Sequence, residues 1–211
     1  AAPSKYEISM RAYRFDSFDS LDELRLREEA DPQPQRGEVL VRVHAVSLNF
    51  RDLAMLRGTY PRKCVPGLIP VSDAAGEIVA VGEGVRALKV GDRVMGAFHP
   101  RWFGGEMPST IASDTYGAES DGWLCDLKAI SQEAVVRAPD ALSYEEACTL
   151  PCAGLTAWTA LTGATPIRAG HTVLVQGSGG VSVFALQLAR AVGATVIATT
   201  SSAAKADQLK A

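Results

Sequence analysis

The sequence has few cysteines, few histidines and no long apolar run. A stretch of about 18 apolar residues, which a membrane-spanning helix needs, is absent, and residues 1–14 lack the apolar segment of a signal peptide. We therefore expect a cytoplasmic protein with no membrane partner. A chain of 211 residues can bury a core without disulfides, so we interpret its four cysteines as reduced thiols. They lack the paired spacing of a zinc knuckle and are Cys64, Cys125, Cys148 and Cys152.

An excess of charge of either sign is also absent. Lys and Arg together number 21 and Asp and Glu number 24, so the net charge is -3. This balance gives no basic surface for a polyanion, and we expect no nucleic-acid partner. The chain is 47% hydrophobic and 21% charged, which is typical of a globular protein and excludes disordered, collagen-like and coiled-coil chains.

The first half of the chain has the periodicity of β-strands. Residues 38–48 alternate, with Val39, Val41 and Val43 on one face and His44 on the other, which predicts a half-buried strand and an exposed histidine. Short apolar segments punctuated by glycine are typical of a small, strongly bent antiparallel barrel. Further strands are predicted at residues 6–15, 23–27, 74–81, 90–94, 123–130 and 134–137.

One short helix interrupts these strands at residues 49–57, and Gly58 supplies its end. Its apolar residues recur with the helical period, which indicates one face packed on a core. The stripe that we expect to face the core consists of Phe50, Leu53, Ala54 and Leu56.

Near residue 143 the pattern changes to alternating strands and helices. Ser143 followed by Glu146 is a capping box that starts a short helix, which we expect Pro151 to end. A strand–helix–strand–helix succession with short connections predicts a βαβ unit in a parallel sheet. The predicted elements are a helix at 155–161, a strand at 172–176, a helix at 181–192, a strand at 195–200 and a helix at 203–211.

The predicted parallel sheet is incomplete, because two strands with their helices cannot cover both faces of a doubly wound sheet. We therefore expect the sequence to be part of a longer chain that continues with further βα units and then barrel strands. We also expect residues 1–211 alone to bind a dinucleotide weakly, since part of the binding crevice would be missing.

A glycine-rich turn after the strand at 172–176 is the strongest local motif. Glycines allow the backbone to approach a pyrophosphate, and the N-terminus of the following helix offers unpaired N–H groups. Ser182 stands where the G-x-G-x-x-G pattern has its third glycine. The alternative is a turn that only allows tight packing of strand on helix. We expect this turn to bind a dinucleotide through Gly177, Ser178, Gly179, Gly180 and Val181.

The end of the second parallel strand bears on the choice of cofactor. An NAD site usually has an Asp or Glu there, which accepts a hydrogen bond from the ribose. Here no carboxylate occurs before Asp207, and the hydroxyls of Thr200 and Ser201 and the amine of Lys205 can bind a phosphate instead. NADPH is therefore the expected cofactor and NADH the alternative, because hydroxyls also cap helices and this lysine can be a solvated helix residue.

Several stretches of the sequence form a recognisable set. They are SLNFRD at 47–52, RGTYP at 57–61, DAAGEIV at 73–79, GDRV at 91–94 and LPCAGLTAW at 150–158, together with the glycine-rich turn. Singly none of them is specific. Together they cover nearly all of the chain, which resembles the medium-chain dehydrogenase/reductase superfamily and, within it, the zinc-independent quinone oxidoreductase-like branch.

This resemblance implies an α/β plus β protein of two domains. Residues 1–152 would form a GroES-like, bent β-barrel catalytic domain. Residues 153–211 would form the first part of a Rossmann-type, doubly wound parallel sheet that binds NADP. The active site would lie in the cleft between the domains. We expect a small-molecule substrate and a homodimer in the full-length form.

The residues at the family's metal positions argue against zinc. Zinc-dependent relatives have a cysteine where this chain has Asn49 and a His-Glu pair where it has Ser72 and Asp73, so that only Cys152 matches a ligand position. A catalytic zinc needs three protein ligands, and the cysteines of the family's structural-zinc lobe have no counterpart within residues 99–121. We therefore expect no metal. The two cysteines closest in sequence, which we interpret as small buried residues, are Cys148 and Cys152.

Without zinc, the chemistry that fits is hydride transfer from NADPH to a quinone or an α,β-unsaturated carbonyl, because conjugation spreads the resulting charge. The resemblance places Asn49 and Tyr60 at the substrate end, as catalytic donors to the developing oxygen anion. The alternatives are a helix N-cap for Asn49 and a packing aromatic for Tyr60. Thr156 resembles the residue that contacts the nicotinamide ring.

The loop at 99–121 is rich in Gly, Pro, Ser and Asp, and loops of this length often carry function. We expect its residues His99, Trp102 and Phe103 to shape the substrate pocket. Two other functions stay open. One is a zinc-type alcohol dehydrogenase for a small alcohol or aldehyde, which the missing ligands disfavour. The other is a non-catalytic nucleotide-binding member of the family, which the intact glycine-rich turn disfavours.

Overall fold

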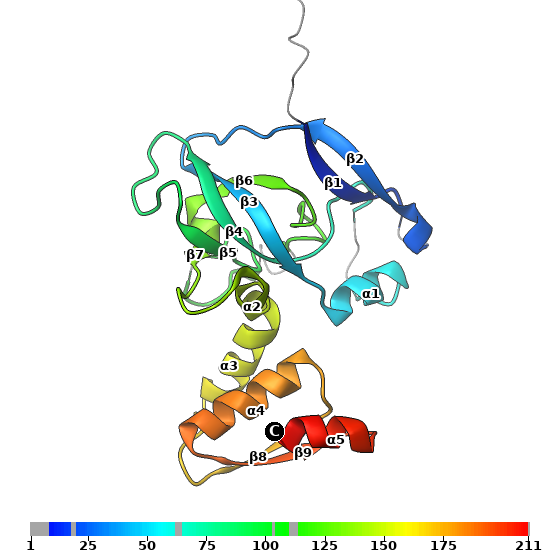
Figure 1. Cartoon of the computed structure of the whole chain (residues 1–211), viewed down its shortest axis with the longest axis vertical. Helices are drawn as coiled ribbons and strands as arrows, with labels where there is room; N and C mark the ends of the chain where they lie inside the picture. The colour runs from blue at the N-terminus through cyan, green and yellow to red at the C-terminus, as the bar shows by residue number, and fades with distance from the viewer. Residues whose placement is uncertain (1–8, 18–19, 62–64, 103, 110–113, 211) are drawn as a thin grey trace, which may run out of the picture. The chain divides into compact units, whose positions relative to one another are not determined.

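The computed structural model describes residues 9–17, 20–61, 65–102, 104–109 and 114–210 of the chain (Figure 1). The chain divides into two compact units, of which the first ends at Pro151 and the second begins at Cys152. In the described residues, no helix is long and apolar enough to cross a membrane. Two residues named above, Cys64 and Phe103, lie outside the described part of the chain.

A five-stranded antiparallel sheet with the strand order β6-β3-β4-β5-β7 forms the centre of the first unit. The register of β3 against β4 shifts twice, which bends the sheet. β1 and β2 form a separate antiparallel pair. The bounds are β1 Ser9–Phe15, β2 Leu24–Ala30, β3 Glu38–Ser47, β4 Asp73–Val81, β5 Arg93–Gly96, β6 Leu127–Ser131 and β7 Val135–Arg137, with short 3-10 helices η1 at Leu21–Glu23 and η3 at Gln132–Ala134.

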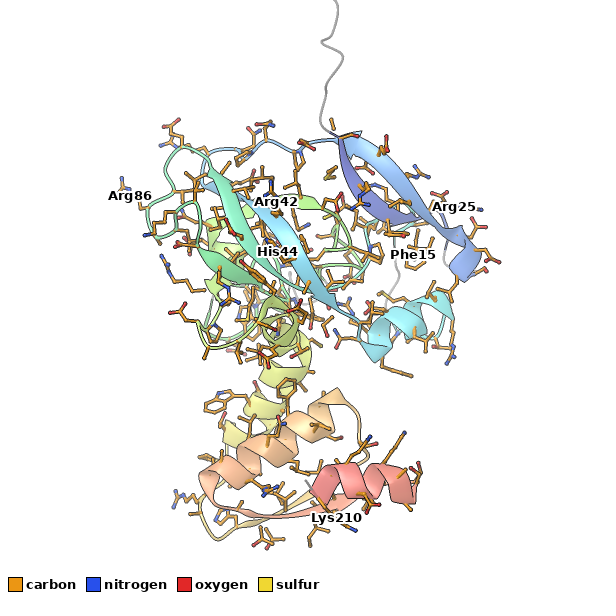
Figure 2. The ribbon with its side chains drawn as sticks, in the orientation of Figure 1. Phe15, Arg25, Arg42, His44, Arg86 and Lys210 are labelled. Carbon is orange, nitrogen blue, oxygen red and sulfur yellow. The ribbon has the colours of Figure 1, made fainter. Side chains whose placement is uncertain are left out.

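The alternation predicted for β3 is confirmed between Val41 and Ala45, whereas Leu40 is buried as well. Val39 and Val41 are buried, whereas Arg42 and His44 are exposed (Figure 2). The ring of His44 stacks on the ring of Tyr144, with the ring centroids 4.3 Å apart. The two valines therefore anchor β3 in the core of the unit. That core also contains Ile78, Val94, Trp123 and Ile130.

The strand predicted at residues 123–130 begins later, at Leu127. Trp123 instead lies in a loop, where its backbone N–H donates to the carbonyl of Val71 at 2.9 Å. Its indole packs on Gly96, and a Cβ at that glycine would lie 2.3 Å from the ring. The core therefore has no room for a side chain at this position of β5.

The helix predicted at residues 49–57 is present as α1 (Phe50–Leu56), but the apolar stripe assigned to it is largely wrong. Phe50 is 78% exposed. Two charged side chains lie on the buried face because each finds polar partners there, which outweighs hydrophobic periodicity in so short a helix. The buried residues of α1 are Arg51, Asp52, Ala54 and Met55.

The capping box predicted at Ser143 is confirmed at the start of α2 (Tyr144–Ala147). The Ser143 hydroxyl accepts from the Glu146 N–H at 3.2 Å, and the Glu146 carboxylate accepts from the Ser143 N–H at 2.8 Å. Pro151, however, does not end this helix. It lies in a π-helical turn, η4 (Leu150–Gly154), which leads into α3 (Leu155–Thr162). Proline is tolerated there because a first-turn N–H has no intrahelical acceptor.

The predicted βαβ arrangement is confirmed in the second unit. β8 pairs in parallel with β9, and α4 connects them. α4 and α5 lie on the same side of the two strands, where they line a common hollow with β9 (Figure 1). Leu174 and Ile197 are 59% and 53% exposed, so the other face of the strands is open. The bounds are β8 Thr172–Gln176, α4 Gly180–Val192, β9 Thr195–Thr199 and α5 Ala203–Lys210.

Candidate functional site

The turn after β8 leaves space beside its backbone. Gly177 has a φ of +84°, a conformation that favours glycine, and its N–H donates to the Thr199 carbonyl at 3.0 Å. A Cβ added at Gly177 or Gly179 would meet no atom within 4 Å, so a ligand can approach the backbone there. The Ser182 hydroxyl donates to the Gln176 carbonyl at 2.8 Å, and serine therefore fits where the pattern has its third glycine.

This turn and the end of β9 line one hollow of about 530 Å³. Among the described residues that line it there is no carboxylate. The Thr200 hydroxyl oxygen is buried and forms no hydrogen bond within the described residues. Thr199 was missed by the sequence reasoning, although its place as the last residue of the second parallel strand is a signal. The lining residues are Gly177, Ser178, Gly179, Thr199, Thr200, Ser201 and Lys205.

Helix capping, the alternative role for the hydroxyls after β9, belongs to Ser202. Its Oγ accepts from the backbone N–H of Lys205 at 3.3 Å, at the start of α5. The hydroxyls of Thr200 and Ser201 are therefore not needed to cap α5 and can bind a ligand. The side chain of Lys205 is exposed and lies at the hollow, where its charge suits an anion.

Three of the predicted cofactor residues do not line this hollow. Gly180 and Val181 form the first turn of α4, whose N–H groups have no intrahelical acceptors and carry the positive end of the helix dipole. Thr156 lies on α3 and is exposed. Contacts of these three residues with a cofactor stay predictions.

Asn49 is the N-cap residue of α1, so that alternative role is real. Its backbone N–H donates to the Asp52 carboxylate at 2.8 Å, and its side-chain amide donates to the Ser47 carbonyl at 3.4 Å. The second contact is long for a hydrogen bond, and the Asn49 side chain also takes part in a capping box with Asp52. Its role as a substrate donor stays a prediction.

Tyr60 follows α1 and is half-buried. Its backbone N–H donates to the Ala54 carbonyl at 3.2 Å, and its ring centroid lies 5.4 Å from the guanidinium carbon of Arg51. No hydrogen bond of the Tyr60 hydroxyl is found within the described residues. The ring therefore packs, as the alternative interpretation has it, while the hydroxyl keeps its capacity to donate.

Two carboxyl groups are buried, that of Asp52 on α1 and that of Asp73 at the start of β4. Burial raises the pKa of Asp52, and the charge of Asp73 raises it further. Asp73 accepts from the Ser72 hydroxyl at 2.6 Å. Burial, with Asp73 as the second cause, raises the pKa of the Cys148 thiol to about 11. Cys148 is thus buried as predicted, whereas Cys152 is only half-buried.

No disulfide joins the described cysteines. Nor do the described His, Cys, Asp and Glu side chains include a group of three or more that could hold a metal ion.

The two arms of the loop at 99–121 meet at Asp114. The Asp114 carbonyl accepts from Nδ1 of His99 at 2.8 Å, which fixes the proton of that ring on Nδ1. The Asp114 carboxylate accepts from Arg101 and from the Ser120 hydroxyl, both at 2.7 Å. The Trp102 ring lies edge-on to His99, with the ring centroids 5.8 Å apart. The structure thus brings His99 and Trp102 together, and their role in shaping a substrate pocket stays a prediction.

Comparisons with known proteins place the chain in a family. The profile of the alcohol dehydrogenase GroES-like domain matches residues 35–140. The chain is 39% identical to a zinc-type alcohol dehydrogenase-like protein of Schizosaccharomyces pombe, over 96% of this chain and 60% of that protein. It is 37% identical to an acryloyl-coenzyme A reductase of Metallosphaera sedula (86% and 56%) and 34% identical to a human quinone oxidoreductase (90% and 52%).

A crystal structure of a candidate alcohol dehydrogenase from Sinorhizobium meliloti 1021 extends the match to both units. It is 40% identical and superposes with a TM-score of 0.88 over 98% of this chain and 60% of that one. The chain therefore spans 52% to 60% of the length of these relatives. With its GroES-like sheet followed by a parallel βαβ arrangement, the chain belongs to the medium-chain dehydrogenase/reductase superfamily.

Proposed function

We propose that the protein is a cytoplasmic, homodimeric reductase that uses NADPH, without zinc, to reduce a quinone or an α,β-unsaturated carbonyl compound. The observation that carries the proposal is the hollow at the end of β9. It combines an open glycine backbone, the hydroxyls of Thr200 and Ser201 and the amine of Lys205, with no carboxylate among its described lining residues.

This set of groups fits a dinucleotide with a 2′-phosphate. The backbone at Gly177 and Gly179 leaves room for the pyrophosphate, and the first turn of α4 offers N–H groups to it. The hydroxyls and the amine after β9 match a phosphate, whereas a ribose with a free 2′-hydroxyl favours a carboxylate. When bound, NADPH supplies a hydride.

The substrate side requires donors for the oxygen that becomes negative during the reduction. Asn49 and Tyr60 provide an amide and a phenol on adjoining segments of the first unit. Conjugation in a quinone or an enone delocalises the charge, so these two donors suffice without a Lewis acid. His99 and Trp102 form part of the pocket wall that selects the substrate.

The second candidate is a zinc-type alcohol dehydrogenase, which the name of the Schizosaccharomyces pombe relative favours. The names of the acryloyl-coenzyme A reductase and of the quinone oxidoreductase favour the first candidate. Against zinc stand Asn49 and Ser72, neither of which is a thiolate or imidazole ligand.

One set of assays separates the candidates. Full-length protein is analysed for zinc and assayed for NADPH oxidation with a benzoquinone, an enone and a simple aldehyde. We expect no stoichiometric zinc, turnover of the quinone or the enone, and activity that withstands a chelator. One tightly held zinc per chain, with turnover of the aldehyde alone, would overturn the proposal. NADPH binding without turnover of any substrate would indicate a non-catalytic member of the family.

A further inference from the structure

Arg51 is a buried cation on α1 to which the reaction described so far gives no role. Its side chain belongs to a residue that is 8% exposed, and no ion pair joins it to a described carboxylate. A buried charge without such a partner is costly, so the contacts that it does make are informative.

The hydrogen bonds of Arg51 lead to one arm of the 99–121 loop. Nη1 donates to the Tyr116 carbonyl and Nη2 to the Thr115 hydroxyl, both at 3.0 Å. The Thr115 hydroxyl in turn donates to the Glu119 carboxylate at 2.7 Å. The Glu119 carboxylate is thus linked to the guanidinium through one intervening hydroxyl, while the neighbouring Asp52 carboxylate interacts with it electrostatically without a hydrogen bond in the described residues. The two hydrogen bonds of Arg51 tie α1 to the base of the loop.

The flat guanidinium also lies against two aromatic rings. Its carbon is 4.6 Å from the ring centroid of Phe98 and 5.4 Å from that of Tyr60, both within the range of a cation–π contact. Phe98 adjoins His99 at the start of the other loop arm, and the two rings meet edge-on. Arg51 thus contacts, by itself, the segment that carries Tyr60 and both arms of the loop.

These contacts matter because few others orient Tyr60. Within the described residues, its hydroxyl forms no hydrogen bond, and the backbone bond to Ala54 fixes the Cα but not the ring. Among the described residues, the guanidinium of Arg51 is the charged group that packs on that ring. Since Nε of Arg51 is buried and without a partner in the same part of the chain, the structure holds the arginine in place at some cost.

We propose that Arg51 is a positioning residue that fixes the ring of Tyr60, and with it the direction of the phenol, against the base of the 99–121 loop. This inference rests on the proposed function, in which Tyr60 donates to the substrate oxygen. Lysine cannot replace arginine here, because an ammonium lacks the planar fork that reaches the Tyr116 carbonyl and the Thr115 hydroxyl while packing on two rings.

The test is a double-mutant cycle in the full-length protein with Arg51→Lys, Tyr60→Phe and the combination. We expect Arg51→Lys to lower kcat for the quinone or enone roughly 10- to 100-fold, as a small misplacement of a donor does, with the Kd of NADPH within about twofold of wild type. If Arg51 acts through Tyr60, the double variant is no slower than Tyr60→Phe alone. Additive losses, or an unchanged kcat in Arg51→Lys, would overturn the inference. Arg57→Lys, an exposed arginine at the end of the same helix, is the matched control.

A second measurement does not depend on activity. The protein is labelled with 3-fluorotyrosine, and the fluorine resonance of Tyr60 is assigned by its loss in Tyr60→Phe among the five tyrosines. We expect this resonance to shift and broaden in Arg51→Lys and to stay unchanged in Arg57→Lys. An unchanged resonance in Arg51→Lys would refute the positioning role. If wild type reduces no substrate, the proposed function fails, while the fluorine spectrum still decides whether Arg51 positions Tyr60.

Discussion

The two units differ in where their functional groups lie. Around α1 in the first unit, charged and polar side chains are buried and held by specific partners, as Arg51, Asp52 and Asp73 show. In the described part of the second unit, the buried side chains are few and apolar, namely Ala157, Leu161, Val175 and Ala189. Its ligand-facing features are backbone shape and exposed hydroxyls. The comparison teaches that substitutions in the first unit act on packing and geometry, whereas those in the second act on access to the backbone and on charge.

The largest effect is expected where the first unit has no space. Gly96→Val places side-chain atoms on the indole of Trp123, which is 1% exposed and has nowhere to move. We expect a loss of about 3 kcal/mol in the free energy of unfolding, at the upper end of overpacking effects, measured by urea denaturation. Ala97→Val, at the next and partly exposed position, is the control. An unchanged midpoint for Gly96→Val would show that this core is looser than its contacts imply.

The next largest effect is a difference in alkylation rate between two cysteines near the boundary between the units in the sequence. Because burial raises the pKa of Cys148 to about 11, from 9.0, its thiol stays protonated well above neutral pH. At pH 8 we expect iodoacetamide to modify the half-buried Cys152 faster than Cys148, as mass spectrometry of peptides would measure. Raising the pH toward 11 should deprotonate the Cys148 thiol and so increase its rate of modification. Equal rates at pH 8 would contradict the difference in environment.

In the second unit, a change of charge should alter binding and leave stability unchanged. Lys205→Glu is expected to weaken NADPH binding roughly 10- to 100-fold, since a charge-assisted contact to phosphate contributes about 1.5–3 kcal/mol, and to affect NADH little. Calorimetric titration of the full-length protein measures both. Arg168→Glu, an exposed residue away from the hollow, controls for the charge change. Comparable losses for both cofactors would exclude 2′-phosphate recognition by this lysine.

The smallest expected effect on stability best separates the second unit from the first, because it should change cofactor binding alone. Gly179→Ala meets no atom within 4 Å and has an ordinary negative φ, so we expect stability within about 0.5 kcal/mol of wild type. The methyl group would nevertheless occupy the space of an approaching pyrophosphate, and we expect NADPH and NADH to bind about 10-fold more weakly. A stable variant with unchanged binding of both cofactors would show that the pyrophosphate does not lie over this glycine.

The second unit and the sheet strands could be predicted from the sequence because their signals are local. Alternation in β3 and the strand–turn–helix pattern around Gly177 each depend on residues a few positions apart. Local signals also explain why the cofactor residues after β9 could be predicted. Six of the residues assigned to the cofactor line one hollow, since the ends of two parallel strands meet at one edge of a sheet.

The error in α1 arose because partners far away in sequence decided which side chains are buried. The periodicity of α1 predicted Phe50 on the buried face, but Arg51 takes that place because Phe98 and Thr115 hold it there. No spacing rule within residues 49–57 contains this information. Pro151 failed as a helix end because the chain resumes a helical path just before it, where a missing N–H costs nothing.

The order β6-β3-β4-β5-β7 also governs when the first unit can acquire its shape. β3 pairs on one side with β6, so that Glu38 meets Ser131, and β5 pairs with β7 near Arg137. Such long loops must close before their contacts stabilise anything, which slows folding of this kind of sheet. During synthesis, one edge of β3 therefore stays unpaired until β6, late in the first unit, has been made. We therefore expect Val39 and Val41, which are buried in the folded core, to be exposed in that interval and to favour association of incomplete chains.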